Sequence, residues 1–160
     1  QGQSIWQDDI ARSMLTSGSL AAMIEDVGIR GVTSNPTIFE KAISGSSDYD
    51  AQIAELSKSD LSAAEIFEQL AVDDIRNACD VFRPIYDLSD GADGFVSIEV
   101  APDLARDAEG TRDAARRLWK KIDRPNLMVK IPGTIEGAPI APEVRAALVD
   151  LARYVTDRDR

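Results

Sequence analysis

The segment Asn126-Leu-Met-Val-Lys-Ile-Pro-Gly-Thr134 is the stretch that decides the fold class, and it contains the most informative residue of the chain. It predicts a short apolar strand that ends at Pro132 and carries one charged side chain, Lys130. Because side chains alternate along a strand, Lys130 shares a face with Met128, and we expect that face to line a barrel or cleft interior. Removal from water lowers the pKa of an ammonium group, and the neutral amine attacks carbonyl carbons. Lys130 is therefore a candidate Schiff-base lysine; the alternative is a strand-end lysine that reaches water.

Three other short apolar segments also predict strands, and helical sequence separates them. The expected strands are 4–7, 32–36, 95–100 and 127–131. The expected helical segments are 10–27, 38–44, 49–57, 63–86, 111–122 and 142–154. Strands that alternate with helical crossovers are parallel, which places the chain in the α/β class.

Each expected strand ends at a polar side chain: Asp8, Asn35, Glu99 and Lys130. In a (β/α) barrel, catalytic groups lie at the carboxyl ends of the strands, so we expect these four residues to converge on one mouth. Alternation along the third strand agrees, since Phe95, Ser97 and Glu99 fall on one face while residues 96, 98 and 100 fall on the face toward the helices.

Structural explanations exist for each of these polar residues. Asp8 or Asp9 could cap the helix that follows, and Asn35 before Pro36 could be ordinary turn chemistry. A buried salt bridge between Glu99 and Lys130 would account for both of those charges.

The composition narrows the class of protein and of chemistry. With 160 residues, 44% of them hydrophobic, the sequence predicts one globular domain over 1–160. No long apolar segment or signal sequence is evident, so we expect a cytoplasmic protein without a membrane partner. The net charge of −10 argues against a nucleic-acid partner.

Cys79 is the one cysteine, so no internal disulfide forms, and its helical spacing predicts a small buried hydrophobe. The absence of histidine excludes Ser-His-Asp triads and histidine-ligated metals, which favours covalent amine chemistry.

Four stretches together make the chain resemble the transaldolases, in particular their longer bacterial form. They lie in order over residues 4–137, and they are Ser4-Ile-Trp-Gln-Asp-Asp9, Gly28-Ile-Arg-Gly-Val-Thr-Ser-Asn-Pro-Thr-Ile-Phe-Glu-Lys-Ala-Ile43, Asp93-Gly-Phe-Val-Ser-Ile-Glu-Val100 and the segment that contains Lys130. The resemblance implies a (β/α)₈ barrel of the TIM type. It also implies transfer of a dihydroxyacetone unit between sugar phosphates in the pentose phosphate pathway, with no cofactor and no metal.

The resemblance also implies a role for each polar residue at a strand end. Lys130 would form the Schiff base with the donor ketose. Glu99 would act through a water on the proton transfers of imine formation. Asp8 would take the hydroxyl proton as the carbon–carbon bond breaks, and Asn35 would form a hydrogen bond with a hydroxyl of the bound three-carbon unit.

Beyond residue 137 the sequence departs from the family pattern, and 138–160 is expected to be a divergent helical end. Four (β/α) units amount to half a barrel, with two open sheet edges that a homodimer could pair. The family's phosphate-binding serine and arginine lie outside the matching stretches. Two alternatives to a transaldolase stay open: a non-catalytic half-barrel that serves as an association module, and a fructose 6-phosphate aldolase. The start of the chain and the long helical connection over 36–86 favour transaldolase over the aldolase.

Overall fold

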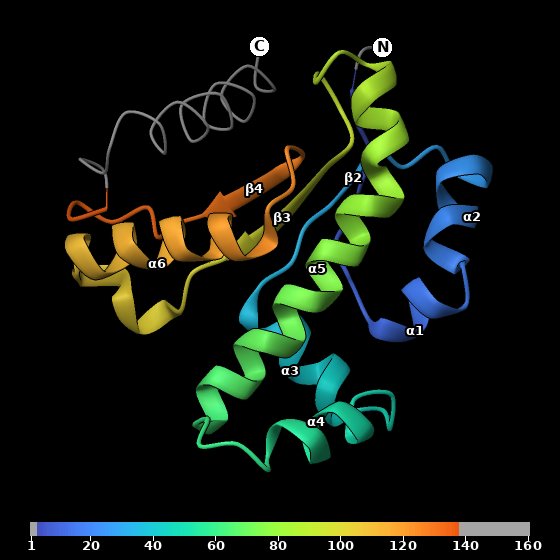
Figure 1. The fold of residues 1–160 in the computed structure, drawn as a ribbon. Helices are drawn as coiled ribbons and strands as arrows, with labels where there is room; N and C mark the ends of the chain where they lie inside the picture. Colours follow the sequence, from blue (N-terminus) through green and yellow to red (C-terminus); the bar gives the residue numbers. More distant parts are fainter. Residues whose placement is uncertain (1–2, 138–160) are drawn as a thin grey trace.

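Four parallel strands form one sheet in the computed structural model, which describes residues 3–137 (Figure 1). The strands are β1 (Trp6–Gln7), β2 (Gly31–Val32), β3 (Phe95–Glu99) and β4 (Leu127–Lys130), and they lie in the sequential order β1-β2-β3-β4. Neighbours in this order pair in parallel, so all carboxyl ends lie at one edge of the sheet. The predicted α/β class with four parallel strands is confirmed.

The helical connections follow the predicted order, with some changes of boundary. They are α1 (Arg12–Thr16), α2 (Ser19–Asp26), α3 (Pro36–Ser44), α4 (Asp50–Leu56), α5 (Ala63–Leu88), the 3-10 turn η1 (Pro102–Arg106) and α6 (Ala108–Ile122). The helix predicted over 142–154 lies outside the described residues. Among residues 3–137, no helix combines the length and the apolar character that crossing a membrane requires.

Two predicted boundaries were wrong, each for a local backbone reason. The helix expected over 10–27 is two helices, because Gly18 adopts a left-handed conformation (φ 78°) between them. The second strand ends at Val32 rather than at Pro36. Pro36 instead occupies the first turn of α3, where a proline loses no intrahelical hydrogen bond and its fixed φ suits the helix.

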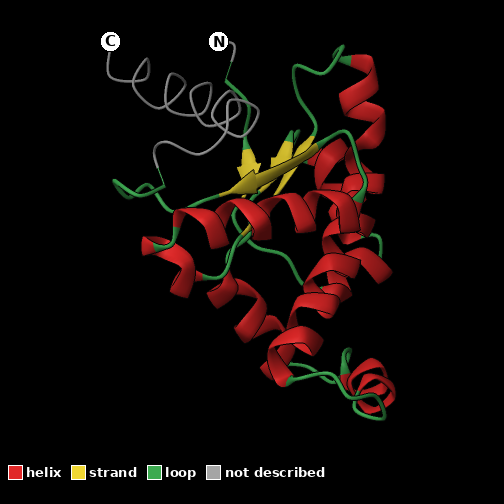
Figure 2. Ribbon diagram, turned by 60° about the vertical axis from the view of Figure 1, so that its left-hand side comes forward, coloured by secondary structure: helices red, strands yellow, loops and turns green. Residues whose placement is uncertain are grey.

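The core lies between the sheet and the helices that cover one of its faces (Figure 2). Val96, Ile98 and Val100 of the third strand segment point into it and are nearly inaccessible to water, as their alternation predicted. Helix α5 contributes the longest stripe of buried side chains, and a capping box of Ser62 and Glu65 fixes where this helix begins. Cys79 is part of the same stripe and is fully buried, so the prediction of a small buried hydrophobe is confirmed; burial also raises the pKa of its thiol to about 12.

The opposite face of the sheet carries the polar residues. Gly31 lies beneath the indole of Trp6, and a Cβ at this position would come within 2.6 Å of that ring. The glycine therefore leaves the space that the Trp6 ring occupies at the amino-terminal end of this face. Thr33, Ser97 and Lys130 follow toward the carboxyl edge and are joined by hydrogen bonds.

A buried polar cluster fastens the segment after β1 to α4 and α5. The Arg12 guanidinium donates to Asp74 at 2.9 Å, the Tyr49 hydroxyl donates to the other oxygen of the same carboxylate at 2.8 Å, and the backbone N–H of Arg12 donates to Tyr49 at 3.0 Å. The guanidinium also lies over the Tyr49 ring, 4.3 Å from its centre. Burial raises the pKa of Asp74, and burial together with the Asp74 charge raises the pKa of Tyr49. The cluster is therefore a desolvated ion pair whose partners satisfy one another.

Replacing Asp74 by alanine is expected to lower the free energy of unfolding by about 3 kcal/mol, because the arginine and the tyrosine lose their shared buried acceptor. Urea-induced unfolding measures this change. Asp80→Ala is the matched control, since it removes a carboxylate that pairs with Arg124 at the surface of the same helix, and we expect it to cost less than about 1 kcal/mol. Equal losses in the two variants would contradict a special role for the buried cluster.

Candidate functional site

Lys130 and Glu99 lie side by side at the carboxyl edge of the sheet. They are register partners in the β3–β4 ladder, and the Lys130 Nζ is 3.4 Å from the Glu99 Oε2. Their side chains keep 26% and 31% of their exposure, so the pair is open to water rather than buried. The salt bridge weighed from the sequence therefore exists, but a buried ion pair does not explain the two residues. The amine remains accessible to a solute that approaches the polar face.

Two hydroxyl groups complete the immediate surroundings of the amine. Lys130 Nζ donates to Thr33 Oγ1 at 3.1 Å, and Ser97 Oγ donates to the same oxygen at 3.2 Å. Neither hydroxyl was singled out from the sequence. The alternation of side chains along a strand could have identified them: Ser97 shares a face with Glu99, and Thr33 follows Gly31 by two residues on the polar face of the sheet.

Asn35 has a structural task that the sequence suggested as an alternative. Its side-chain oxygen accepts a hydrogen bond from the backbone N–H of Ile38 at 2.9 Å and caps the start of α3. The side-chain amide nitrogen is not used in this bond, so it is the group of Asn35 that is left to bind a ligand.

Asp8 directly follows β1 and is exposed. Within residues 3–137 its carboxylate makes no hydrogen bond or ion pair. The idea that Asp8 or Asp9 caps the next helix was wrong, because α1 begins after Ala11 and has no side-chain cap. Of the four residues predicted to converge, the structure thus joins Lys130 to Glu99 directly and places Asp8 and Asn35 after the neighbouring strands.

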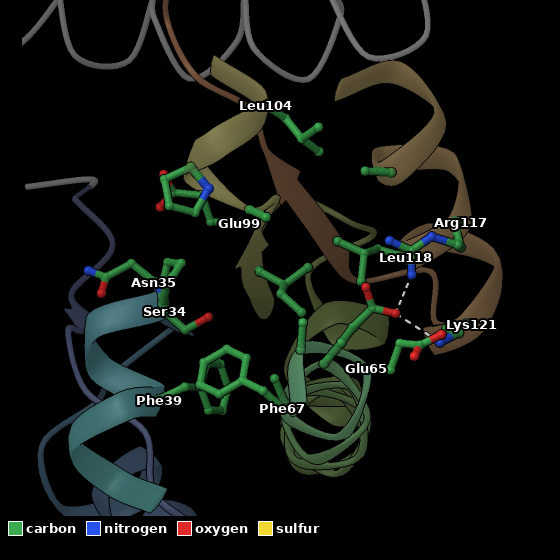
Figure 3. A pocket seen from close by; sticks show the side chains of 18 residues that line it. Ser34, Asn35, Phe39, Glu65, Phe67, Glu99, Leu104, Arg117, Leu118 and Lys121 are labelled. Atoms are coloured by element: carbon green, nitrogen blue, oxygen red, sulfur yellow. Dashed lines mark hydrogen bonds and ion pairs between the residues drawn. The ribbon is translucent and has the colours of Figure 1, made fainter. Parts of the chain in front are cut away.

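A cavity of about 660 Å³ lies beside this edge, between α3, α5, η1 and α6 (Figure 3). Asn35 and Glu99 contribute to its wall, together with an apolar lining that includes Phe39, Phe67 and Leu118. Lys130 and Asp8 do not line it. The cavity therefore adjoins the amine site along the strand ends without containing the amine.

One side of the cavity carries a compact charged group. Arg117 and Lys121 of α6 both donate to the Glu68 carboxylate on α5, the lysine at 2.8 Å (Figure 3). Burial by itself would raise the pKa of Glu68, but the hydrogen bonds from the two cations outweigh it and lower that pKa. The two cations share the one carboxylate, which leaves a net positive charge, and their hydrogen bonds join α6 to α5.

The chemistry available at the edge follows from these contacts. A primary amine with an adjacent carboxylate and a hydroxyl can attack a carbonyl carbon and exchange protons with the resulting oxygen. Within residues 3–137, no group of three or more cysteine, aspartate or glutamate side chains is arranged to hold a metal ion. The adjacent amine, carboxylate and hydroxyl are the groups on which covalent amine chemistry depends.

Comparison with known proteins agrees with that chemistry. The sequence matches the family described as Transaldolase/Fructose-6-phosphate aldolase over residues 5–150. The chain belongs to this transaldolase family. The family fold is a TIM barrel, and four parallel strands with flanking helices are the half-barrel-like arrangement expected from part of it.

Relatives within the family are close in sequence but longer. The chain is 52% identical to the transaldolase of Trichodesmium erythraeum over 143 residues, which cover 89% of this chain and 38% of that protein. It is 53% identical to the transaldolase of Acidothermus cellulolyticus over 138 residues, or 86% of this chain and 37% of that protein. The transaldolase of Thiobacillus denitrificans is 50% identical, with 85% and 38% covered. The chain thus spans about two fifths of the length of these transaldolases.

Proposed function

We propose that the chain carries the amine site of a transaldolase, which transfers a dihydroxyacetone unit between sugar phosphates through a Schiff base on Lys130. The observation that carries this proposal is the position of the Lys130 Nζ, 3.4 Å from a carboxylate and 3.1 Å from a hydroxyl, at the strand edge of a transaldolase-family fold. The relatives described above are all named transaldolases, which favours this activity over the aldolase. A transaldolase requires an aldose phosphate as acceptor, so dependence of the reaction on that acceptor distinguishes a transaldolase from the aldolase.

The proposed reaction uses the four strand-end residues in sequence. The neutral Lys130 amine adds to the ketose carbonyl, and Glu99 acts through a water on the proton transfers that release the former carbonyl oxygen as water. The protonated imine then accepts the electron pair of the breaking carbon–carbon bond, while Asp8 takes the proton of the neighbouring hydroxyl. Asn35 donates its amide N–H to a hydroxyl of the three-carbon unit. The resulting enamine attacks an aldose carbonyl carbon, and Asp8 returns its proton to the new alkoxide. Water then hydrolyses the imine, which releases the product ketose and frees the Lys130 amine.

The proposal also covers the cellular compartment, the pathway and the oligomeric state of the chain. We place the activity in the cytoplasm and in the pentose phosphate pathway, as family membership suggests. For the 160-residue chain in isolation, we propose a homodimer that pairs β1 and β4, which have no further strand beside them among residues 3–137, since an unpaired parallel edge offers backbone donors and acceptors to another chain. A non-catalytic association module is the competing function, and the trapping experiment below separates it from the enzyme.

Borohydride reduction in the presence of fructose 6-phosphate should attach the sugar covalently to Lys130. Peptide mass spectrometry would locate the adduct. Lys130→Met should abolish it and leave the urea midpoint nearly unchanged, because the lysine is partly exposed and its ion pair is long. Failure to trap the folded chain would reject catalysis by this chain and favour the association module, whereas unfolding of Lys130→Met would make the ion pair structural.

Substituting Glu99 by glutamine should slow imine formation more than it weakens sugar binding. The amide keeps the size of the side chain but cannot exchange protons with the intermediate, so a loss on the order of a hundredfold is expected in the rate of trapping. Stopped reactions at several sugar concentrations separate the limiting rate from the half-saturating concentration. An unchanged limiting rate would remove Glu99 from the proposed mechanism.

Sedimentation of the isolated 160-residue chain should reveal a dimer whose population grows with protein concentration. Pairing of the open edges is the reason, because the unpaired N–H and C=O groups of β1 and β4 gain partners. A well-folded monomer over the whole concentration range would contradict the homodimer. It would leave the proposed amine chemistry untouched, since Lys130, Glu99 and Thr33 all belong to one chain.

A further inference from the structure

We propose that Ser97 is a positioning residue for Lys130 and acts through the hydroxyl of Thr33. The inference rests on the proposed function, because it concerns the same amine. Ser97 lies on β3 two residues before Glu99 and is only 3% exposed, so substrate does not reach it directly. Its hydroxyl is nevertheless connected to the reacting nitrogen by two consecutive hydrogen bonds.

The hydrogen bonds from Lys130 and Ser97 use both lone pairs of the Thr33 hydroxyl oxygen. Its hydroxyl oxygen receives the Lys130 N–H at 3.1 Å and the Ser97 O–H at 3.2 Å. A hydroxyl oxygen has two lone pairs and one proton, so both lone pairs are then occupied. The Thr33 proton is directed away from both neighbours. If the bond between Ser97 and Thr33 runs in the opposite direction, Ser97 instead engages that proton, with the same result for the amine.

The orientation of the Thr33 hydroxyl matters most when the Lys130 amine is neutral. A neutral amine has two N–H bonds and one lone pair, and the lone pair is what attacks the carbonyl carbon. Thr33 Oγ1 accepts one N–H of Lys130, and the Glu99 carboxylate 3.4 Å away has no proton to donate, so the lone pair is left for the substrate. A freely rotating Thr33 hydroxyl could donate its own proton to that lone pair and compete with the substrate. Ser97 prevents this rotation.

A neighbouring serine provides the matched comparison. Ser34 is fully buried, and its hydroxyl donates to the backbone oxygen of Ser97 at 2.6 Å. It thus supports the same point of β3 from the segment that follows β2, but it has no hydroxyl contact with Thr33 or Lys130. A purely structural role of Ser97 in the packing of β2 against β3 would make the two serines equivalent.

Competitive labelling tests the inference without requiring substrate. Lys130 is acetylated by trace acetic anhydride over a pH series, and peptide mass spectrometry relative to a free amine yields the reactivity of its neutral form. Ser97→Ala should lower this reactivity about three- to tenfold, the equivalent of one hydrogen bond, whereas Ser34→Ala should stay within about twofold. Ser97→Cys, which keeps the volume with a weaker donor, should also lower the reactivity and serves if the alanine variant does not fold.

A double-mutant cycle with Thr33→Val tests whether Ser97 acts on Lys130 through the Thr33 hydroxyl. If Ser97 acts through Thr33, Ser97→Ala has no further effect once the Thr33 hydroxyl is gone, whereas independent packing effects add. Additive losses, equal losses in the Ser97 and Ser34 variants, or unchanged reactivity would each overturn the inference. Borohydride trapping with fructose 6-phosphate is run in parallel on the unsubstituted chain. A sugar adduct without a Ser97 effect rejects this inference alone, and absence of the adduct rejects the proposed function.

Discussion

The register between β3 and β4 is the constraint on which the site depends. Asn126 sets it at the start of β4: its buried side-chain nitrogen donates to the backbone oxygens of Cys79 in α5 at 2.8 Å and of Gly94 before β3 at 2.9 Å. With that end fixed, Lys130 falls opposite Glu99. A slip by one residue would turn Lys130 into the helix-covered core and bring Val129 or Ile131 to the polar face. The free energy of burying an ammonium among apolar side chains therefore reinforces the same register.

Helix α5 makes buried hydrogen bonds that hold the start of β4 and the segment after β1, and none of them involves the residues next to the amine. Helix α5 carries the Cys79 carbonyl that Asn126 uses, and it also carries Asp74, which holds Arg12 and Tyr49. One helix thus connects the start of β4 with the segment that follows β1. The amine itself keeps a long ion pair and partial exposure, which is the combination that a nucleophile needs: fixed in direction, yet accessible.

The sequence predicted the elements well where periodicity was strong and boundaries poorly where one residue decided them. Alternation along 95–100 correctly separated Val96 and Ile98 from Ser97 and Glu99, because both faces of that strand have distinct environments. The break at Gly18 escaped prediction, since apolar spacing continues on both sides of it. Asn35 was ambiguous by nature, because one side chain has an oxygen for the helix cap and a nitrogen for a ligand. The link from Ser97 to Lys130 through Thr33 needed three strands in register, which local patterns do not contain.

The proposed chemistry divides into parts with different structural demands. Imine formation requires an amine with a free lone pair and groups that exchange protons with it, and Thr33, Glu99 and Lys130 are brought together within one chain. Transfer between two sugar phosphates demands more, because the donor and then the acceptor must be held with reacting atoms about 3 Å apart while water is kept from the enamine. Beside the cavity, Arg117 and Lys121 both pair with Glu68 and keep about half of their exposure. The proposed amine site can therefore be assembled by local strand pairing, whereas the proposed transfer also needs groups that position two sugars.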